Sequence, residues 1–298
     1  MRLPSVVARL YKADTHSSLS CHFLREDIEL QLLPIQNIKR YLSLTIRSED
    51  SDEARRAILK GLTGDDDLFY AEERVADFIR SIARTALYYG DAAYELVLLG
   101  LRDESKLFSL ESITATSVCR MFGQYFQVLP RADMEQRRLP IILLDRKRTF
   151  LVNLPRISAW RWRRIMDSLS KIDKASLSAA LNEVQGYDFD LQRRLIERAQ
   201  LLVTNSVPWV QRQSLRPKQM SGVYFAWRWL KMQLFTFELR DRILDMINGA
   251  LKCAGGTRGF CAQLELRGLP TIDDAECAIR ELTSGAVGPN IVSRFTGF

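Results

Sequence analysis

The segment from Val223 to Leu251 constrains the fold more than any other part of the sequence. It runs for about 29 residues without proline, and its single glycine, Gly249, comes near its end. As one α-helix it would extend roughly 43 Å, at about 1.5 Å per residue. The aromatic side chains on several sides of its start must be covered, by the chain's own core or by other copies. The sequence therefore predicts one long helix near residues 223–251, and we expect neighbouring copies to cover it.

A subunit interface is predicted on this helix, because a helix of this length outgrows a modest domain. The residues assigned to the interface are Trp227, Leu230, Leu234 and Phe237. The alternative is that the same side chains pack inside the chain's own core. The sequence leaves both readings open.

The composition is that of a globular protein with a basic surface. Of the 298 residues, 47% are hydrophobic and 27% are charged, which is enough to build a sizeable core. Lys and Arg number 43 against 36 Asp and Glu, a net charge of +7. This balance suits a polyanionic partner without requiring one.

No membrane partner, metal or cofactor is predicted. No window has the roughly 18 apolar residues of a membrane span, and the N-terminus lacks the apolar run of a signal peptide. The five cysteines are scattered without a CxxC pair, and the only histidines, His16 and His22, match no metal-ligand spacing. We therefore expect an intracellular protein with reduced thiols.

The rest of the chain mixes helices and strands, so the predicted class is α+β with a small antiparallel meander sheet. Helical spacing predicts one helix from Ser51 to Leu62 and another from Leu68 to Tyr89, which Gly90 ends in a left-handed cap. A helix is also expected to begin at Ser158, and a further one spans Asp188 to Val203. The predicted strands are Ile28–Leu33, Tyr41–Ile46, Tyr94–Leu101, Ser117–Met121, Gln124–Leu129, Pro140–Leu144 and Thr149–Leu154.

The C-terminal part adds a strand and a helix after the long helix. Cys253–Gly259 is rich in glycine and is predicted to be a loop, because it lacks the GxxxxGK[ST] spacing of a phosphate cradle. An alternating strand follows from Phe260, and Thr271 caps a helix that Gly285 ends. The predicted organisation is an α+β domain over residues 1–204, a linker over 205–222, and a third part over 223–298.

The sharpest local bias is the run Trp160-Arg161-Trp162-Arg163-Arg164. Arginine neutralises phosphate and indole rings stack on bases, so Arg161, Arg163 and Arg164 are candidate nucleic-acid-binding residues, together with Lys231 on the long helix. The alternative is a helix that buries Trp162 while its arginines stay in solvent.

No catalytic signature is present, so an enzyme is not predicted. Asp91 and Glu95 are the carboxylates nearest the Gly90 break, and the sequence offers them no partner for acid–base chemistry. A turn residue and a strand charge account for both.

The stretch IARTALYYGDAAYELV resembles tailed-bacteriophage portal proteins, in which a glycine joins a wing-domain helix to the first strand of a small sheet. Leu107–Pro130 is similar to the next step of that family, and the likeness covers about residues 58–173. Portal rings also place long helices at their channel, followed here by a strand and a capped helix. One departure is length, because portal subunits are usually much longer than this chain.

The resemblance implies a structural subunit rather than an enzyme. It implies a ring of identical copies, with residues 1–204 as a wing-like domain, through which double-stranded DNA passes with weak and non-specific contacts. Capsid and terminase proteins would be further partners, and the protein would act in the virion or the host cytoplasm. The alternative is a basic nucleic-acid-binding module that uses the Arg/Trp helix.

Overall fold

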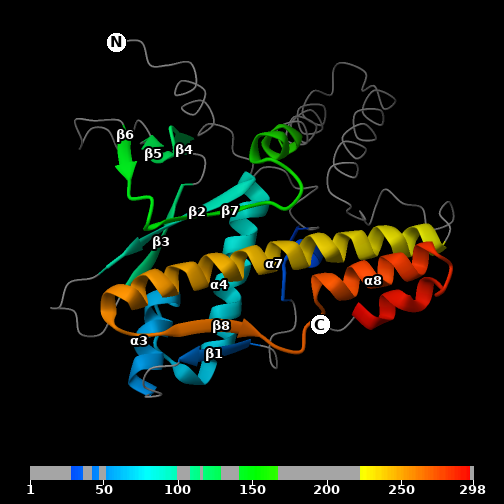
Figure 1. Ribbon diagram of the computed structural model, residues 1–298, viewed down its shortest axis with the longest axis horizontal. Helices are drawn as coiled ribbons and strands as arrows, with labels where there is room; N and C mark the ends of the chain where they lie inside the picture. The colour runs from blue at the N-terminus through cyan, green and yellow to red at the C-terminus, as the bar shows by residue number, and fades with distance from the viewer. Residues whose placement is uncertain are drawn as a thin grey trace, which may run out of the picture. The chain divides into compact units, whose positions relative to one another are not determined.

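The computed structural model confirms the α+β class (Figure 1). The residues that it describes are 28–35, 42–46, 52–98, 108–114, 117–128, 141–166 and 222–295. The chain divides into two compact units, which interleave along the sequence. The sheet unit comprises Met1–Ser17, Ile38–Asn153 and Asp241–Gly268, and the helical unit comprises Ser18–Asn37, Leu154–Arg240 and Leu269–Phe298.

The sheet unit contains two three-stranded antiparallel sheets rather than one meander. In the first, β2 (Asp91–Val97) lies between β3 (Ser109–Ile113) and β7 (Thr149–Asn153). In the second, β5 (Gln124–Val128) lies between β4 (Val118–Met121) and β6 (Ile141–Leu144). The neighbours β6 and β7 therefore join different sheets, because each pairs with a different central strand. This pairing is a long-range choice that the turn between them does not encode.

These two sheets pack on each other, and helices cover the opposite face of the first. Ala93, Ile113 and Leu144 form the cluster between the sheets. On the other face of β2 and β7, Tyr94 and Phe150 are cross-strand partners. The ring of Tyr94 meets that of Phe78 at 6.0 Å in an edge-on contact. The result is a three-layer arrangement that buries both faces of the central strand.

The helices of the sheet unit follow the predicted pattern closely. They are α3 (Asp52–Thr63), the short turn η3 (Leu68–Tyr70) and α4 (Ala71–Tyr89). Gly90 has φ of 90°, and its N–H donates to the Ala86 carbonyl at 2.7 Å. This confirms the left-handed cap, which only glycine adopts without strain.

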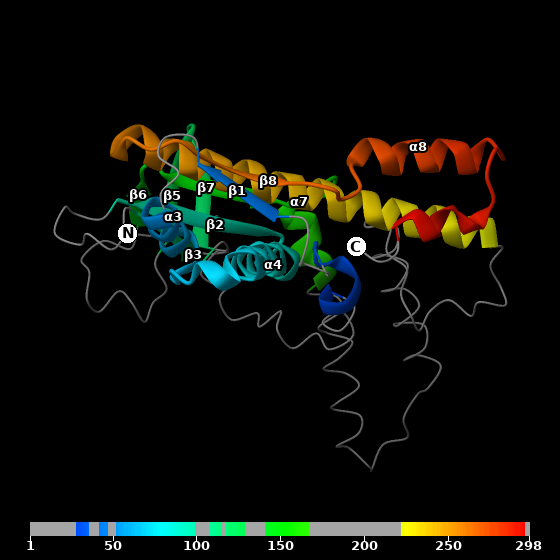
Figure 2. The same ribbon diagram turned by 90° about the horizontal axis from the view of Figure 1, so that it is seen from below.

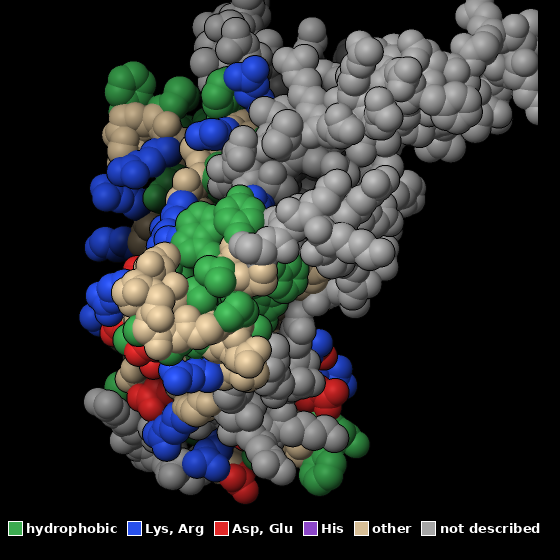
Figure 3. All heavy atoms as spheres, turned by 90° about the vertical axis from the view of Figure 1, so that its right-hand side faces the viewer, with side chains coloured by type: hydrophobic (Ala, Val, Ile, Leu, Met, Phe, Trp, Pro, Cys, Tyr) green, Lys and Arg blue, Asp and Glu red, His purple; other side chains and the backbone are tan. Residues whose placement is uncertain are grey.

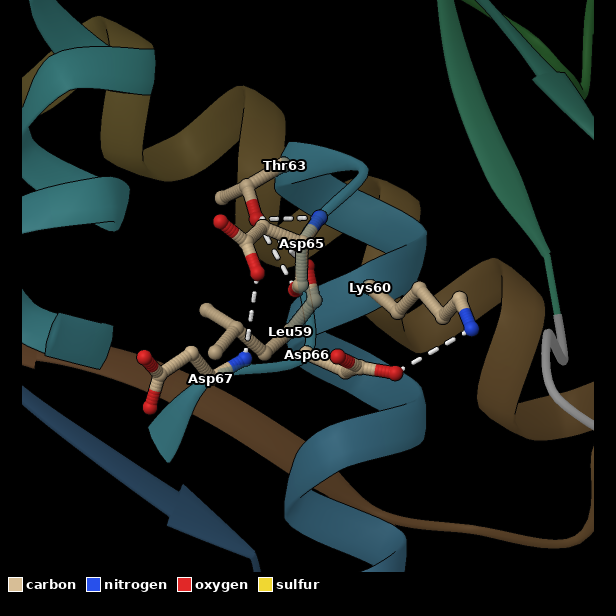
Figure 4. Close-up of polar contacts among 6 residues, drawn as sticks. All are labelled: Leu59, Lys60, Thr63, Asp65, Asp66 and Asp67. Carbon is tan, nitrogen blue, oxygen red and sulfur yellow. Dashed lines mark hydrogen bonds and ion pairs between the residues drawn. The ribbon is translucent and has the colours of Figure 1, made fainter. Parts of the chain in front are cut away.

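The turn between α3 and η3 is built from short polar side chains (Figure 4). The Thr63 hydroxyl donates to the Leu59 carbonyl at 2.9 Å, and Lys60 pairs with Asp66 at 3.1 Å. Asp65 accepts the backbone N–H of Asp67 at 3.2 Å. Asp67 in turn accepts from the Phe69 N–H at 2.9 Å, so the acidic run forms the entry to η3.

The long helix is α7 (Gly222–Arg258), with 37 residues and a length of about 55 Å. The prediction of a loop over residues 253–259 is wrong, because residues through Arg258 are helical and Gly259, at φ of 82°, ends the helix. Gly255 is required by packing: a Cβ there would lie 2.2 Å from the Phe260 carbonyl oxygen. The glycines therefore let the chain turn back closely against the helix.

The sheet unit also contains a third sheet, which has two strands and whose second strand follows α7 in the chain. The alternating pattern predicted a strand here, and it is β8 (Ala262–Leu266). It pairs antiparallel with β1 (Leu42–Ile46), a partner that the pattern did not indicate. The Asn248 side chain of α7 binds the other edge of β8: it donates to the Leu264 carbonyl at 3.0 Å and accepts the Leu264 N–H at 2.8 Å. A side-chain amide thus occupies the position of a further strand.

The helical unit is built around the first half of α7. α8 (Ile272–Thr283) lies alongside it (Figures 1 and 2), and η7 (Pro289–Phe295) completes the cluster. The members of this core are Ala226, Leu230, Leu234, Phe237, Ala275, Ala278, Ile279, Leu282, Ile291 and Phe295. The capping box between Thr271 and Asp274 is confirmed, with reciprocal bonds at 2.8 and 3.2 Å.

Two further predictions differ from the structure or fall outside it. The expected strand over Ile28–Leu33 is wrong, since η2 (Ile28–Leu32) is a helical turn of the π type. The expected helix over Asp188–Val203 lies outside the described residues, as does the linker over 205–222 apart from Gly222. The division into domains at those positions stays a prediction.

Candidate interaction surfaces

The Arg/Trp segment begins a helix in the helical unit, and residues 159–166 are helical. Ser158 caps it, because its hydroxyl accepts the Arg161 N–H at 3.4 Å. Trp162 is fully buried, whereas the side chain of Trp160 is 66% exposed. The burial of Trp162 agrees with the alternative in which this helix is anchored in the core by one indole.

The arginines of this segment differ in their surroundings. Arg161 and Arg164 are exposed and Arg163 is half-buried. The guanidinium carbon of Arg164 lies 4.8 Å from the ring centroid of Trp160, a cation–π contact on the surface. The nucleic-acid role of these three arginines stays a prediction, and the exposed Arg164–Trp160 pair is its best-placed part.

A bidentate ion pair anchors the loop that leads into this segment. Arg156 Nε lies 2.9 and 3.0 Å from the two carboxylate oxygens of Glu238 on α7, and its Nη2 also donates to Glu238 Oε1. The hydrogen bonds raise the pKa of the Arg156 guanidinium. Arg156 has φ of 60°, an unfavourable value for a side-chain-bearing residue, and the ion pair helps to hold it there.

The residues assigned to the subunit interface lie largely inside the chain's own core. Leu230 and Leu234 are 0% and 1% exposed, and Phe237 is 8% exposed. Trp227 is partly buried against the same cluster. Leu230, Leu234 and Phe237 are therefore core residues of the chain, which is the alternative that the sequence left open. A side chain already covered by α8 and η7 offers almost no surface to another copy, and the interface role assigned to these residues stays a prediction.

Lys231, the fourth predicted nucleic-acid contact, is half-buried beside Trp227. Its Nζ lies 5.9 Å from the Trp227 ring centroid, at the outer limit of a cation–π contact. Its role toward nucleic acid also stays a prediction.

The apolar surface that remains on this helix is its first turn. Val223, Tyr224 and Phe225 are 48%, 45% and 43% exposed. Figure 3, which views the side of the molecule where α7 begins, shows hydrophobic side chains gathered there with Lys and Arg beside them. The sequence pattern missed this turn because it counted aromatic residues along the helix without knowing which of them α8 and η7 would cover.

The carboxylates next to the Gly90 break have structural positions. Asp91 begins β2, and Glu95 lies opposite Glu111 and Thr149 in the sheet register. Burial raises the pKa of the neighbouring Tyr94 to about 12. No group of three His, Cys, Asp or Glu able to hold a metal ion occurs among the described residues. No described helix is long and apolar enough to cross a membrane.

Comparison with known proteins finds likeness among solved structures only. No family model and no curated protein matches the sequence. A solved structure described as the neck of an empty GTA particle, computed with C6 symmetry, is similar over 96% of this chain and 94% of that chain. The identity is 12% and the TM-score is 0.42, values too low to assign a fold or a function.

Proposed function

We propose that the chain is a structural subunit of a portal-like ring through which double-stranded DNA passes into or out of a phage capsid. The observation that carries the proposal is the unbroken α7, which is followed directly by β8 and then by the capped helix α8. This order is the one that the resemblance to portal proteins implies for the channel side of a subunit. The α4–Gly90–β2 junction, formed as the resemblance requires, adds support at a distant point of the chain.

A ring of identical subunits needs a heterologous interface, in which one surface meets a different surface of the next copy. Because the middle of α7 is covered by the chain itself, the covering of a long helix no longer supports assembly. The exposed first turn of α7, Val223–Phe225, is the apolar surface of that helix which remains for a neighbour.

The proposal gives the chain a structural role without catalysis. A passage for DNA must avoid a tight grip, so its phosphate contacts are weak, independent of sequence and sensitive to salt. The net charge of +7 is compatible with such contacts. Capsid and terminase proteins are the further partners that this role entails, with the virion or the host cytoplasm as its location.

The test is the mass and shape of the purified protein. Light scattering after size exclusion and negative-stain imaging should show closed rings with a central opening, in the absence of DNA. A chain that stays monomeric across the accessible concentration range contradicts the ring.

A second candidate is a small basic module that binds nucleic acid through the Arg/Trp helix. The exposed contact between Arg164 and Trp160 favours it, because indole and guanidinium together can stack on a base and neutralise phosphate. This module would be a monomer or dimer that binds tightly, and replacing Arg161, Arg163 and Arg164 by alanine would abolish binding. Retained binding in that triple variant removes this candidate.

A further inference from the structure

One end of the sheet β4–β5–β6 brings together residues that are far apart in the sequence. In its register, Arg120 lies opposite Tyr125 and Tyr125 opposite Leu144. The two-residue tip Phe122-Gly123 and the turn over residues 145–148 therefore leave the sheet at the same end. The Cys253 thiol of α7 also donates to the Lys147 carbonyl at 3.6 Å, which places Lys252 on a neighbouring element.

Four cations lie on the elements that meet at this end, and we call them the basic rim: Arg120, Arg146, Lys147 and Lys252. All four are exposed. None of them forms an ion pair within the described part of the chain. The nearby Asp145 is already engaged by Arg148, at 3.6 Å, and by the Lys147 backbone N–H, at 2.9 Å. Their charge is thus available to a partner.

An aromatic side chain projects from the same end. Phe122 is 100% exposed and has φ of 52°, a conformation that disfavours a bulky residue. Asn, Asp or Gly would form this turn at lower cost. An apolar side chain held outward in this way, next to cations, has the character of a wedge that contacts a sugar or base edge.

We propose that the basic rim, with Phe122, is the surface through which this chain contacts the phosphate backbone of double-stranded DNA. The inference rests on the proposed function, which requires a DNA contact without assigning it to these residues. Exposed unpaired cations fit phosphate, and each phosphate neutralised changes the salt dependence of binding by about 0.9 in log–log slope.

Two other partners are less well matched. An anionic lipid surface would attract the same cations, but stable anchoring needs more buried apolar surface than Phe122 and the partly exposed Met121 supply. A protein partner would have to present acidic side chains to the rim and an apolar pocket to Phe122. No feature of the described residues points to such a partner. Of the three partners, only DNA would be bound mainly through the four charges, with the apolar contact of Phe122 as a minor part.

The experiment uses the full chain and a short fluorescent DNA duplex over a series of salt concentrations. The rim variant carries Arg120→Gln, Arg146→Gln, Lys147→Gln and Lys252→Gln. A matched control makes the same charge change at exposed arginines elsewhere, with Arg56→Gln, Arg267→Gln, Arg280→Gln and Arg294→Gln. We expect the rim variant to lower the slope of log affinity against log salt by about 3 to 4, and the control to leave it nearly unchanged. Equal slopes for the two variants overturn the proposal.

Ring assembly is measured separately, so the two proposals can fail independently. If wild-type protein forms rings and the rim variant keeps its salt slope, the rim is wrong and the ring stands. If the wild-type protein forms no ring but the rim variant has a smaller slope of log affinity against log salt, the ring proposal is wrong and the DNA contact stands. Sedimentation with phosphatidylserine vesicles completes the test: rim-dependent binding to vesicles with an unchanged DNA slope assigns the surface to lipid and overturns the DNA contact.

Discussion

At the scale of single residues, the tip of the β4–β5 hairpin is governed by backbone conformation rather than by packing. Phe122 and Gly123 have φ of 52° and 78°, the signs of a type I′ turn. Neither position is packed: the Phe122 side chain is wholly exposed, and a Cβ on Gly123 would meet nothing within 4 Å. Substitutions here therefore report backbone strain with little contribution from contacts.

The first prediction is that Phe122→Asn stabilises the chain by about 0.5–1 kcal/mol, because Asn tolerates positive φ. Gly123→Ala, at the next position, should destabilise the chain by about 1 kcal/mol, because alanine is strained at the positive φ of Gly123. Urea denaturation of both variants measures the difference. A loss of stability in the Asn variant would mean that Phe122 packs against part of the folded protein.

Tyr94 supplies a residue-scale prediction about pH. Burial raises its pKa to about 12 from an ordinary value of 10.0, and the Thr85 hydroxyl offsets only part of this effect. Because the folded pKa is the higher one, the stabilisation by neutral Tyr94 is complete below pH 10 and declines as pH rises toward 12. The decline amounts to roughly 3 kcal/mol at most.

Tyr94→Phe should therefore flatten the alkaline fall of the unfolding free energy between these two pH values. The exposed Tyr224→Phe, which removes a tyrosine hydroxyl at the surface, is the control. If Tyr94→Phe and the wild type lose stability in parallel above pH 10, another group governs the alkaline transition.

At the scale of elements, the end of α7 depends on one of two adjacent glycines. A Cβ on Gly255 would lie 2.2 Å from the Phe260 carbonyl oxygen, whereas a Cβ on Gly256 has open space around it. Gly255→Ala must displace backbone and should cost several kcal/mol, about the size of an overpacked core substitution. Gly256→Ala should instead stabilise the helix by about 1 kcal/mol.

Thermal unfolding of the two glycine variants provides a matched comparison, since the same methyl group is added one residue apart. The predicted signs are opposite. Equal effects would show that the chain after α7 does not pack back on the helix as described.

The elements that the sequence predicted well are those set by neighbouring residues. Gly90 ends α4, and Thr271 with Asp274 opens α8. Each signal lies within a few residues of the structure that it forms. The last turns of α7 were missed because a glycine-rich segment is typical of a loop. The reason for Gly255 is the close approach of the Phe260 carbonyl, which the sequence does not indicate.

The distribution of strands between two sheets was not predictable in the same way. The turn over residues 145–148 suits a hairpin between β6 and β7, yet these two strands do not pair with each other. β6 pairs with β5, and β7 pairs with β2. Likewise, the exposed fraction of each side chain on α7 depends on α8 and η7, which come after it in the sequence. The candidate residues at the Arg/Trp segment were recognised by composition, whereas the basic rim required the register.

At the scale of the whole molecule, the question is which side chains of α7 hold a subunit together and which are available to another copy. Leu234 is 1% exposed within the cluster, so Leu234→Ala should lower the unfolding free energy by about 2–5 kcal/mol. The double variant Val223→Ser and Phe225→Ser removes exposed apolar surface, and should change stability by less than about 0.5 kcal/mol.

The two α7 variants should separate folding from assembly. Light scattering is expected to give a smaller molar mass for the Val223 and Phe225 variant than for the wild-type ring. Its urea midpoint should stay near that of the wild type. Unchanged ring mass in this variant would assign the interface to other surfaces of the chain.

The Asn248 side chain, which joins α7 to β8, also makes local unfolding detectable by chemical analysis. Asn248 is followed by Gly249, a dipeptide prone to deamidation when the backbone is flexible, because the glycine N–H can then attack the side-chain carbonyl. In the native chain that side chain is held on both sides by Leu264, and its backbone is helical. Each excursion to an open state exposes the pair, and conversion to aspartate would replace a donor with a carboxylate facing the Leu264 carbonyl. In stored protein, deamidated Asn248 would therefore accumulate in proportion to the time spent locally unfolded. Mass spectrometry would detect it as a slow mass gain in the peptide that contains Asn248.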